Sequence, residues 1–231
     1  MPGIRTTMPL LVVAMLVRGA GAQDSPASNT QQLIEQLGDK NERIIKTAVE
    51  SLTKQGPQVV PALVDALDTR KECQMQFVAS GVLRRIEPAH PRIETALATL
   101  ARGDCSGNSK QDFIFKQEAA FALNRSVSGL ALLTDMVPHK DLLTRRRVAF
   151  ALEDLTEKID SPIERLRPSA ALIDAAAQTL PKLAPFLTDA DEMLRCVTLE
   201  ALQQASASSH SSIAAAAKGL LAGKNVNCSR L

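Results

Sequence analysis

The sequence contains neither tryptophan nor tyrosine, and six phenylalanines are its share of large aromatic rings. β-Sandwiches and β-barrels depend on aromatic and β-branched residues, whereas alanine and leucine, which recur throughout this chain, favour close-packed helices. Sugar sites commonly stack their ligand on Trp or Tyr, so the absence of both weighs against carbohydrate binding. With 45% hydrophobic and 23% charged residues, the composition is otherwise that of an ordinary globular protein. It favours an all-α fold.

The sequence motifs of common enzyme classes are also missing. There is no GxSxG, HExxH, P-loop or GxGxxG motif, and His90, His139 and His210 have no second ligand at metal-binding spacing. Paired carboxylates such as Glu153-Asp154 occur, but on a helix they usually lie on a solvated face. We therefore expect a chain that is not an enzyme, with no catalytic residue, no cofactor and no metal site.

The N-terminus has the pattern of a secretory signal peptide. Arg5 provides positive charge, an apolar run covers residues 8–17, and Ala20-Gly21-Ala22 forms a small-residue cleavage site before Gln23. The apolar run is too short to span a bilayer. We therefore expect residues 1–22 to be removed and no membrane insertion after cleavage.

Cleavage would leave an extracytoplasmic chain, periplasmic or secreted, without excess positive charge. It removes two arginines and no acid, so the balance of 27 basic against 25 acidic residues becomes 25 against 25. Nucleic-acid affinity depends on neutralising phosphates, so we expect no nucleic-acid partner. We expect residues 23–29 to be flexible and residues 30–231 to form the folded domain.

A repeated helical pattern runs through this domain. Each of five segments opens with a cap-like or acidic residue, carries small or apolar residues seven, eight and ten positions on, and has leucine at eleven. Positions seven, eight and eleven share one helix face, where small residues allow neighbouring helices to approach closely. Residues with short side-chain oxygens at the opening are good N-caps, and Glu72 is a poor one. The segments are 41–52, 72–83, 112–123, 141–152 and 191–202, and the expected caps are Asn41, Asp112, Asp141 and Asp191.

Partner helices are expected between these segments. Glycine and proline punctuate the chain between the proposed helices, and extra length at residues 103–110 and 160–168 is best interpreted as loops. The sequence therefore predicts five antiparallel helical hairpins and a C-terminal capping helix. The partner helices are 30–37, 58–67, 92–101, 128–137 and 170–187, and the capping helix is 211–222.

Two of the segments carry a resemblance to a known family. DLLTRRRVAFAL at 141–152 and DEMLRCVTLEAL at 191–202 resemble the Asp-x-x-Val-Arg-x-x-Ala-x-x-Ala-Leu second helix of HEAT and HEAT-like (PBS-lyase-type) repeats. VPAL at 60–63 and LPKL at 180–183 resemble the family's proline-bent first helix. The resemblance covers residues 30 to about 222. It implies a right-handed α-solenoid, a superhelix of stacked hairpins, and says little about function.

The family has a ladder of Asp and Arg residues, one pair in each repeat. The resemblance places this ladder at Asp112 with Lys116, at Asp141 with Arg145, and at Asp191 with Arg195, whereas the first two hairpins lack it. Opposite charges four residues apart on a helix add only about 0.2 to 0.5 kcal/mol each. We therefore interpret the ladder as a packing register.

A binding role is the expectation that follows. Helical solenoids expose long surfaces suited to macromolecular partners, so we expect another protein as partner, with this chain as scaffold, assembly factor or inhibitor. Two alternatives stay open. HEAT-like repeats also occur in lyases that attach bilins to cysteines, and an exported chain could serve as a cell-wall or carbohydrate-binding accessory protein. The sequence indicates no oligomeric state.

All four cysteines follow residue 22, and an even count in an exported chain favours disulfides over free buried thiols, the alternative. The repeat register predicts Cys73 with Cys105 and Cys196 with Cys228. In each pair the first cysteine lies early in a second helix and the other lies just past the end of the following helix. Both pairs are 32 residues apart.

One column of the repeat suggests where a partner docks. Just before the final pair it holds Glu50, Gly81, Phe121, Phe150 and Glu200, and a position that accepts Glu twice is not expected in the deep core. In the family the second helices line the concave face. Phe121 and Phe150, with Arg146 and Arg147 beside them, are therefore candidate partner-binding residues. The alternative, with both rings as core spacers and both arginines solvated, stays open.

Overall fold

The computed structural model describes residues 26–107, 109–224 and 228. The expected signal peptide at residues 1–22 lies outside them. The first helix begins at Pro26 instead of residue 30, so the last four residues of the segment expected to be flexible are helical.

The described residues form eleven α-helices, three 3-10 segments and no β-strand. They alternate as the repeat pattern predicts, with five hairpins followed by one closing helix. The first helices of the hairpins are α1 (Pro26–Gln36), α3 (Val60–Thr69), α5 (Pro91–Arg102), α7 (Val127–Thr134) and α9 (Ala170–Thr179). The second helices are α2 (Glu42–Gln55), α4 (Cys73–Ile86), α6 (Lys110–Leu123), α8 (Leu142–Ile159) and α10 (Glu192–Ser206), and α11 (Ser211–Leu221) closes the chain. The 3-10 segments are η1 (Gly56–Val59), η2 (Glu164–Leu166) and η3 (Leu180–Thr188).

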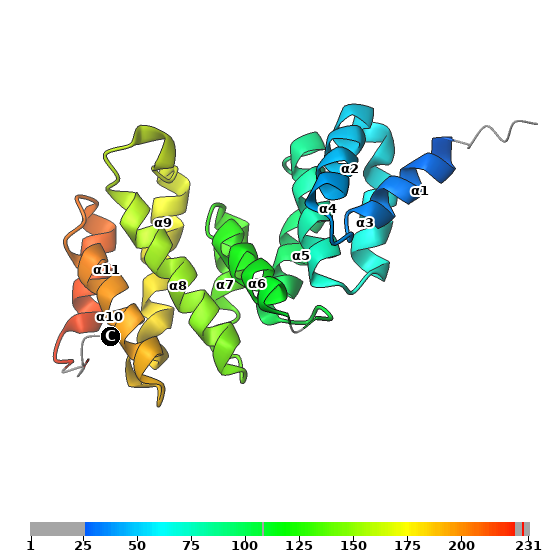
Figure 1. Ribbon diagram of the computed structural model, residues 1–231. Helices are drawn as coiled ribbons and strands as arrows, with labels where there is room; N and C mark the ends of the chain where they lie inside the picture. The colour runs from blue at the N-terminus through cyan, green and yellow to red at the C-terminus, as the bar shows by residue number, and fades with distance from the viewer. Residues whose placement is uncertain (1–25, 108, 225–227, 229–231) are drawn as a thin grey trace, which may run out of the picture.

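The hairpins stack in sequence order, with α1 and α11 at opposite ends of the row (Figure 1). Each second helix packs on the second helix of the next hairpin, and each first helix packs on the next first helix, from α1 with α3 to α9 with α11. Contacts between nearest neighbours in a row define a helical-repeat solenoid. The protein is an all-α solenoid of five hairpins and a closing helix.

The final leucine of each repeat lies in the core that runs along this row. Each is at most 3% exposed, and the small residues one turn earlier are buried with them, so second helices approach closely. Thr198 occupies one of the small positions, where its hydroxyl donates to the carbonyl oxygen of Leu194 and so leaves no unpaired polar atom. The five leucines are Leu52, Leu83, Leu123, Leu152 and Leu202.

The N-caps follow the sequence prediction with one exception. Asn41, Asp141 and Asp191 each accept a backbone N–H of the first turn. Glu72 precedes α4 without a side-chain cap bond, as expected of a poor cap. The prediction for Asp112 is wrong, because α6 begins two residues earlier, at Lys110. Ser109 is the cap there, and Asp112 completes a capping box by accepting from the backbone N–H of Ser109.

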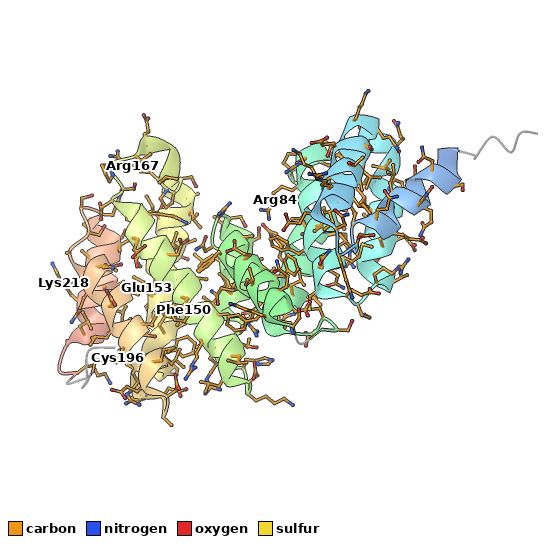
Figure 2. All side chains as sticks on the ribbon, viewed as in Figure 1. Arg84, Phe150, Glu153, Arg167, Cys196 and Lys218 are labelled. Atoms are coloured by element: carbon orange, nitrogen blue, oxygen red, sulfur yellow. A yellow bond between two sulfur atoms is a disulfide. The ribbon has the colours of Figure 1, made fainter. Side chains whose placement is uncertain are left out.

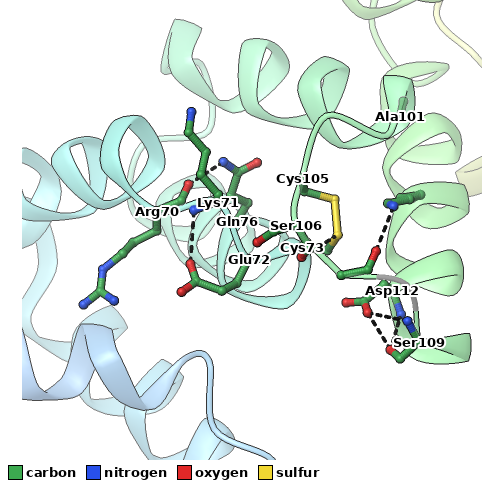
Figure 3. Close-up of a disulfide and its surroundings, with 12 residues drawn as sticks. Arg70, Lys71, Glu72, Cys73, Gln76, Ala101, Cys105, Ser106, Ser109 and Asp112 are labelled. Carbon is green, nitrogen blue, oxygen red and sulfur yellow. Dashed lines mark hydrogen bonds between the residues drawn. A yellow bond between two sulfur atoms is a disulfide. The ribbon is translucent and has the colours of Figure 1, made fainter.

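Two disulfides join helices that are neighbours in the row. Cys73, the first residue of α4, bonds to Cys105 just past α5, and the two Cα atoms are 5.0 Å apart (Figure 3). Cys196 in α10 bonds to Cys228 beyond α11, with 5.6 Å between Cα atoms. These are the two pairs that the repeat register predicts. Around the first, Ser106 donates to the carbonyl oxygen of Lys71 and accepts from the N–H of Cys73, so backbone bonds also hold the loop against α4.

Reduction of the Cys73–Cys105 bridge should lower the free energy of unfolding by about 3 to 4 kcal/mol, because the bridge closes a loop of about 32 residues in the unfolded chain. Denaturant unfolding of the oxidised protein and a Cys73→Ser/Cys105→Ser variant measures the difference. A peptide map without reduction serves as the control. A linked peptide containing Cys73 and Cys196 would contradict the pairing.

Candidate functional site

Three consecutive arginines near the start of α8 tie neighbouring hairpins together. Arg145 donates from Nε to Asp189 of the next hairpin at 3.1 Å, and from Nη1 to the carbonyl oxygens of His139 and Lys140. Arg195 repeats the second arrangement one hairpin later, where it donates to the carbonyls of Asp189 and Ala190. The ladder arginines therefore bind the turn before their own helix.

This arrangement corrects the expected pairing of charges four residues apart. Asp141 and Asp191 are occupied as caps, and Lys116 donates to the carbonyl oxygen of Gly107 instead of pairing with Asp112. A turn leaves carbonyl oxygens without partners, and a long cationic side chain that starts five to nine residues later can reach them. The ladder residues thus serve packing, as expected, but their cationic side chains bind backbone carbonyl oxygens and, for Arg145, the next hairpin.

Arg146 forms a two-point ion pair with Asp191. Its Nε lies 3.0 Å from Oδ1 and its Nη2 lies 2.5 Å from Oδ2, and this parallel geometry is the strong form of an arginine–carboxylate contact. The hydrogen bond from Arg146 is the main cause that lowers the pKa of Asp191, and the same bond raises the pKa of Arg146. The guanidinium of Arg146 is therefore bound to the residue that caps α10.

Arg147 is buried, so the expectation that it lies exposed beside the phenylalanines is wrong. Its side chain is 4% exposed, its Nη1 donates to the carbonyl oxygen of Ala101 at 2.9 Å, and its guanidinium lies 5.8 Å from the centre of the Phe113 ring. Burial is the main cause that lowers its pKa, and the charge of Asp141 opposes that shift. Arg147 stabilises the contact between α5 and α8, where the carbonyl oxygens at the end of α5 need a donor.

Phe121 and Phe150 lie on adjacent second helices, α6 and α8. Both rings are half-buried and pack against the core, so they are neither free surface anchors nor fully buried spacers. Asn124 holds the two helices at this level, because its buried side-chain amide donates to the carbonyl oxygen of Ala151 at 2.6 Å and to Asp154 at 2.8 Å. No sequence motif points to this contact, because the two hydrogen-bond partners of Asn124 lie about 30 residues further along the chain.

Carboxylates gather beside these rings. Glu153 follows Phe150 by one turn of α8 (Figure 2), and the pKa of Glu153 is raised first by burial and then by the charges of Glu200, Glu157 and Asp154. Glu157 and Glu200 are exposed. None of Glu153, Glu157 and Glu200 forms an ion pair with a described residue. We call Phe121, Phe150, Glu153, Glu157 and Glu200 the acidic face.

Two other kinds of site were sought over the described part of the chain. No group of three or more His, Cys, Asp or Glu side chains there is placed to hold a metal ion. No helix within the same residues has the length and apolar character needed to cross a membrane.

The structures similar to this chain are distant ones, and they include an engineered protein and designed armadillo repeat proteins. No family model matches the chain, and no curated protein matches it. An engineered protein of known structure is 17% identical, with a TM-score of 0.34 over 84% of this chain and 95% of its own. A designed armadillo repeat protein is 14% identical, with a TM-score of 0.32 over 84% and 98%. Another, in complex with the peptide (KR)4, is 14% identical, with a TM-score of 0.23 over 84% and 99%. The fold assignment rests on the packing of this chain's own helices.

The Arg146–Asp191 pair should make stability depend on pH in the acid range. The ordinary pKa of Asp191 is 3.8 and the folded protein lowers it, so the stabilisation is complete above about pH 4 and is lost as pH falls through the folded pKa. Asp191→Asn keeps the cap oxygen and removes the charge. We expect it to cost about 1 kcal/mol at pH 7, and we expect this difference to shrink as the pH falls below about 4, as measured by denaturant unfolding. An unchanged difference across this range would contradict the assignment.

Substitution of both half-buried rings should destabilise the protein to an intermediate extent. Full burial of a phenylalanine is worth about 3 to 5 kcal/mol on truncation, so Phe121→Ser with Phe150→Ser should cost about 2 to 4 kcal/mol in total. Leu143→Ser, at a side chain that is 44% exposed, is the control and should cost much less. Thermal unfolding measures both, and an unchanged melting temperature for the double variant would show that the rings are free anchors.

Proposed function

We propose that this chain is an exported, non-catalytic protein-binding module of HEAT-like repeats, which binds its partner through the acidic face. The observation that carries the proposal is the group of carboxylates without cationic partners on α8 and α10, which begins one turn from the half-buried ring of Phe150, with the half-buried ring of Phe121 on the adjacent helix α6. Aromatic rings anchor protein interfaces, and rim charges select the partner and guide its approach. The partner segment would therefore carry basic side chains next to an apolar one.

Repulsion within the acidic face favours such a partner. Burial raises the pKa of Glu153 first, and the like charges of Glu200, Glu157 and Asp154 raise it further, so the folded protein holds this carboxylate at a cost. A lysine or arginine from a partner would relieve that repulsion, whereas an anionic partner would add to it. Phe121 and Phe150 would contribute apolar contact area beside the charges.

Several features support the other parts of the proposal. The two disulfides suit an oxidising compartment, and residues 1–22 have the composition of a signal peptide. The recurrent Asp–Arg positions, with arginine bound to the preceding turn and to the next hairpin, support a HEAT-like repeat over other helical repeats. The absence of enzyme motifs from the sequence supports a role without catalysis.

Charge reversal on the acidic face tests the proposal without disturbing the core. Glu157→Lys with Glu200→Lys changes two exposed side chains and should weaken partner binding by more than about tenfold without lowering the melting temperature. The matched control is Glu87→Lys with Asp174→Lys, which makes the same change in net charge at exposed positions elsewhere. The partner is first isolated with the mature chain from its native extracytoplasmic fraction and identified by mass spectrometry, and Kd is then measured. Equal affinity for both double variants would contradict the proposal.

A further inference from the structure

A cavity of about 380 Å³ lies where the row of repeats departs from its usual spacing. Its walls come from the turn after α6, the last turns of α8, and the residue 160–168 segment that leads into α9. This segment is the longer of the two loops expected from the sequence. Small-molecule sites commonly measure about 300 to 1,000 Å³, so the cavity is large enough for a small organic ligand.

Three basic side chains line the cavity: Arg125, Lys158 and Arg167. Lys158 is partly neutralised by Asp154, 2.5 Å from its Nζ, and Arg167 donates from Nε to the carbonyl oxygen of Ser161 at 2.6 Å. Arg125 is exposed and makes no hydrogen bond or ion pair with a described residue. The cavity therefore holds positive charge that the protein itself does not balance.

A second pocket shares Arg125 with this cavity and is lined by Arg84 and Glu94 as well. The pKa of Arg84, at the end of α4, is lowered first by burial and next by the charge of Arg125, while Glu94 opposes the shift. Figure 2 shows Arg84 on the side of the N-terminal hairpins, well apart from Arg167 on the segment between α8 and α9. The N-terminus of α9 also begins at the cavity, because Ser169, which caps this helix, is one of the lining residues, and a helix N-terminus carries partial positive charge.

The rest of the lining is partly apolar, from Leu155, Leu166, Pro168 and Leu172, and partly polar, from Asn124 and Ser169. Leu155 and Leu172 are buried, whereas Leu166 remains 43% exposed. Ile163 in the same segment is 46% exposed. An inorganic anion would leave Leu166 and Ile163 uncovered, whereas an anion with an apolar body could cover part of their exposed surface and gain from its burial.

We propose that this cavity binds an organic anion that carries a carboxylate beside an apolar body. The carboxylate lies against Arg125 and Lys158, and the apolar body lies against the three leucines. This ligand has the opposite charge to the partner proposed for the acidic face, so the two proposals are independent.

Isothermal titration of the mature chain with octanoate tests this site. Octanoate should bind at one saturable site. Arg125→Gln should weaken binding about two- to fivefold, as expected for an ion pair that solvent partly screens, and Arg125→Gln with Lys158→Gln should weaken it about tenfold. Lys182→Gln, at an exposed lysine outside the cavity, is the matched control and should bind like the unaltered protein.

Two further probes separate charge from apolar contact. The octyltrimethylammonium cation has a similar tail and the opposite charge, and inorganic phosphate has the charge without the tail. We expect neither to compete with octanoate. The proposal is overturned if octanoate does not bind, if Arg125→Gln binds it as tightly as the unaltered protein, or if either comparison probe binds equally well. Arg125 supports no part of the fold, so a changed affinity in its variant is not a failure to fold.

Discussion

Asp191 links local folding to the assembly of the row. Its Oδ1 accepts the backbone N–H of Leu194 and so starts α10, while both of its carboxylate oxygens accept from Arg146 of the preceding hairpin. One hairpin earlier, Asp141 caps α8 and accepts the hydroxyl of Thr144, and that hydroxyl contacts the carbonyl oxygen of Arg102 at the end of α5. The point at which a second helix begins is therefore also the point at which its hairpin is fixed to the previous one. A solenoid without long-range closure needs such contacts, because each repeat is stabilised only by its neighbours.

The sequence was sufficient to predict the elements that depend on local chemistry. Three caps, the order of the hairpins and the cysteine pairs follow from residue spacing, since each depends on positions a few residues apart or on the repeat period. Ser109 was missed because two residues, Ser109 and Asp112, can both cap a helix, and only the backbone path of the loop before α6 decides between them. The repeat period favoured the wrong one because the loop shifts the start of the helix.

The candidate site was less predictable, because it depends on contacts between hairpins. Arg145, Arg146 and Arg147 are identical in type and consecutive in sequence, yet their partners differ. Arg145 binds the preceding turn and the next hairpin, Arg146 binds the next hairpin, and Arg147 binds the previous one. The three side chains point in different directions because successive residues of a helix are rotated by about 100°. Which partner each one meets depends on how α5, α8 and α10 pack together. Phe121 and Phe150 show the same limit, since half-burial is a property of the space between two helices and not of the column in the repeat.

The chain after residue 22 has equal numbers of basic and acidic residues, but charges of opposite sign gather in different places. Carboxylates without partners lie along the acidic face, whereas Arg125, Lys158 and Arg167 gather around a cavity near the ends of α6 and α8. Basic residues at helix C-termini are stabilised by the helix dipole, so part of this arrangement serves folding alone. The dipole of α6 favours a cation at Arg125, yet that charge, after burial, also disfavours the charge of Arg84, and no helix dipole accounts for the repulsion around Glu153. Both groups include residues of α8, whose hairpin is followed by the longest departure from the repeat spacing, and there the chain holds charge that folding does not require.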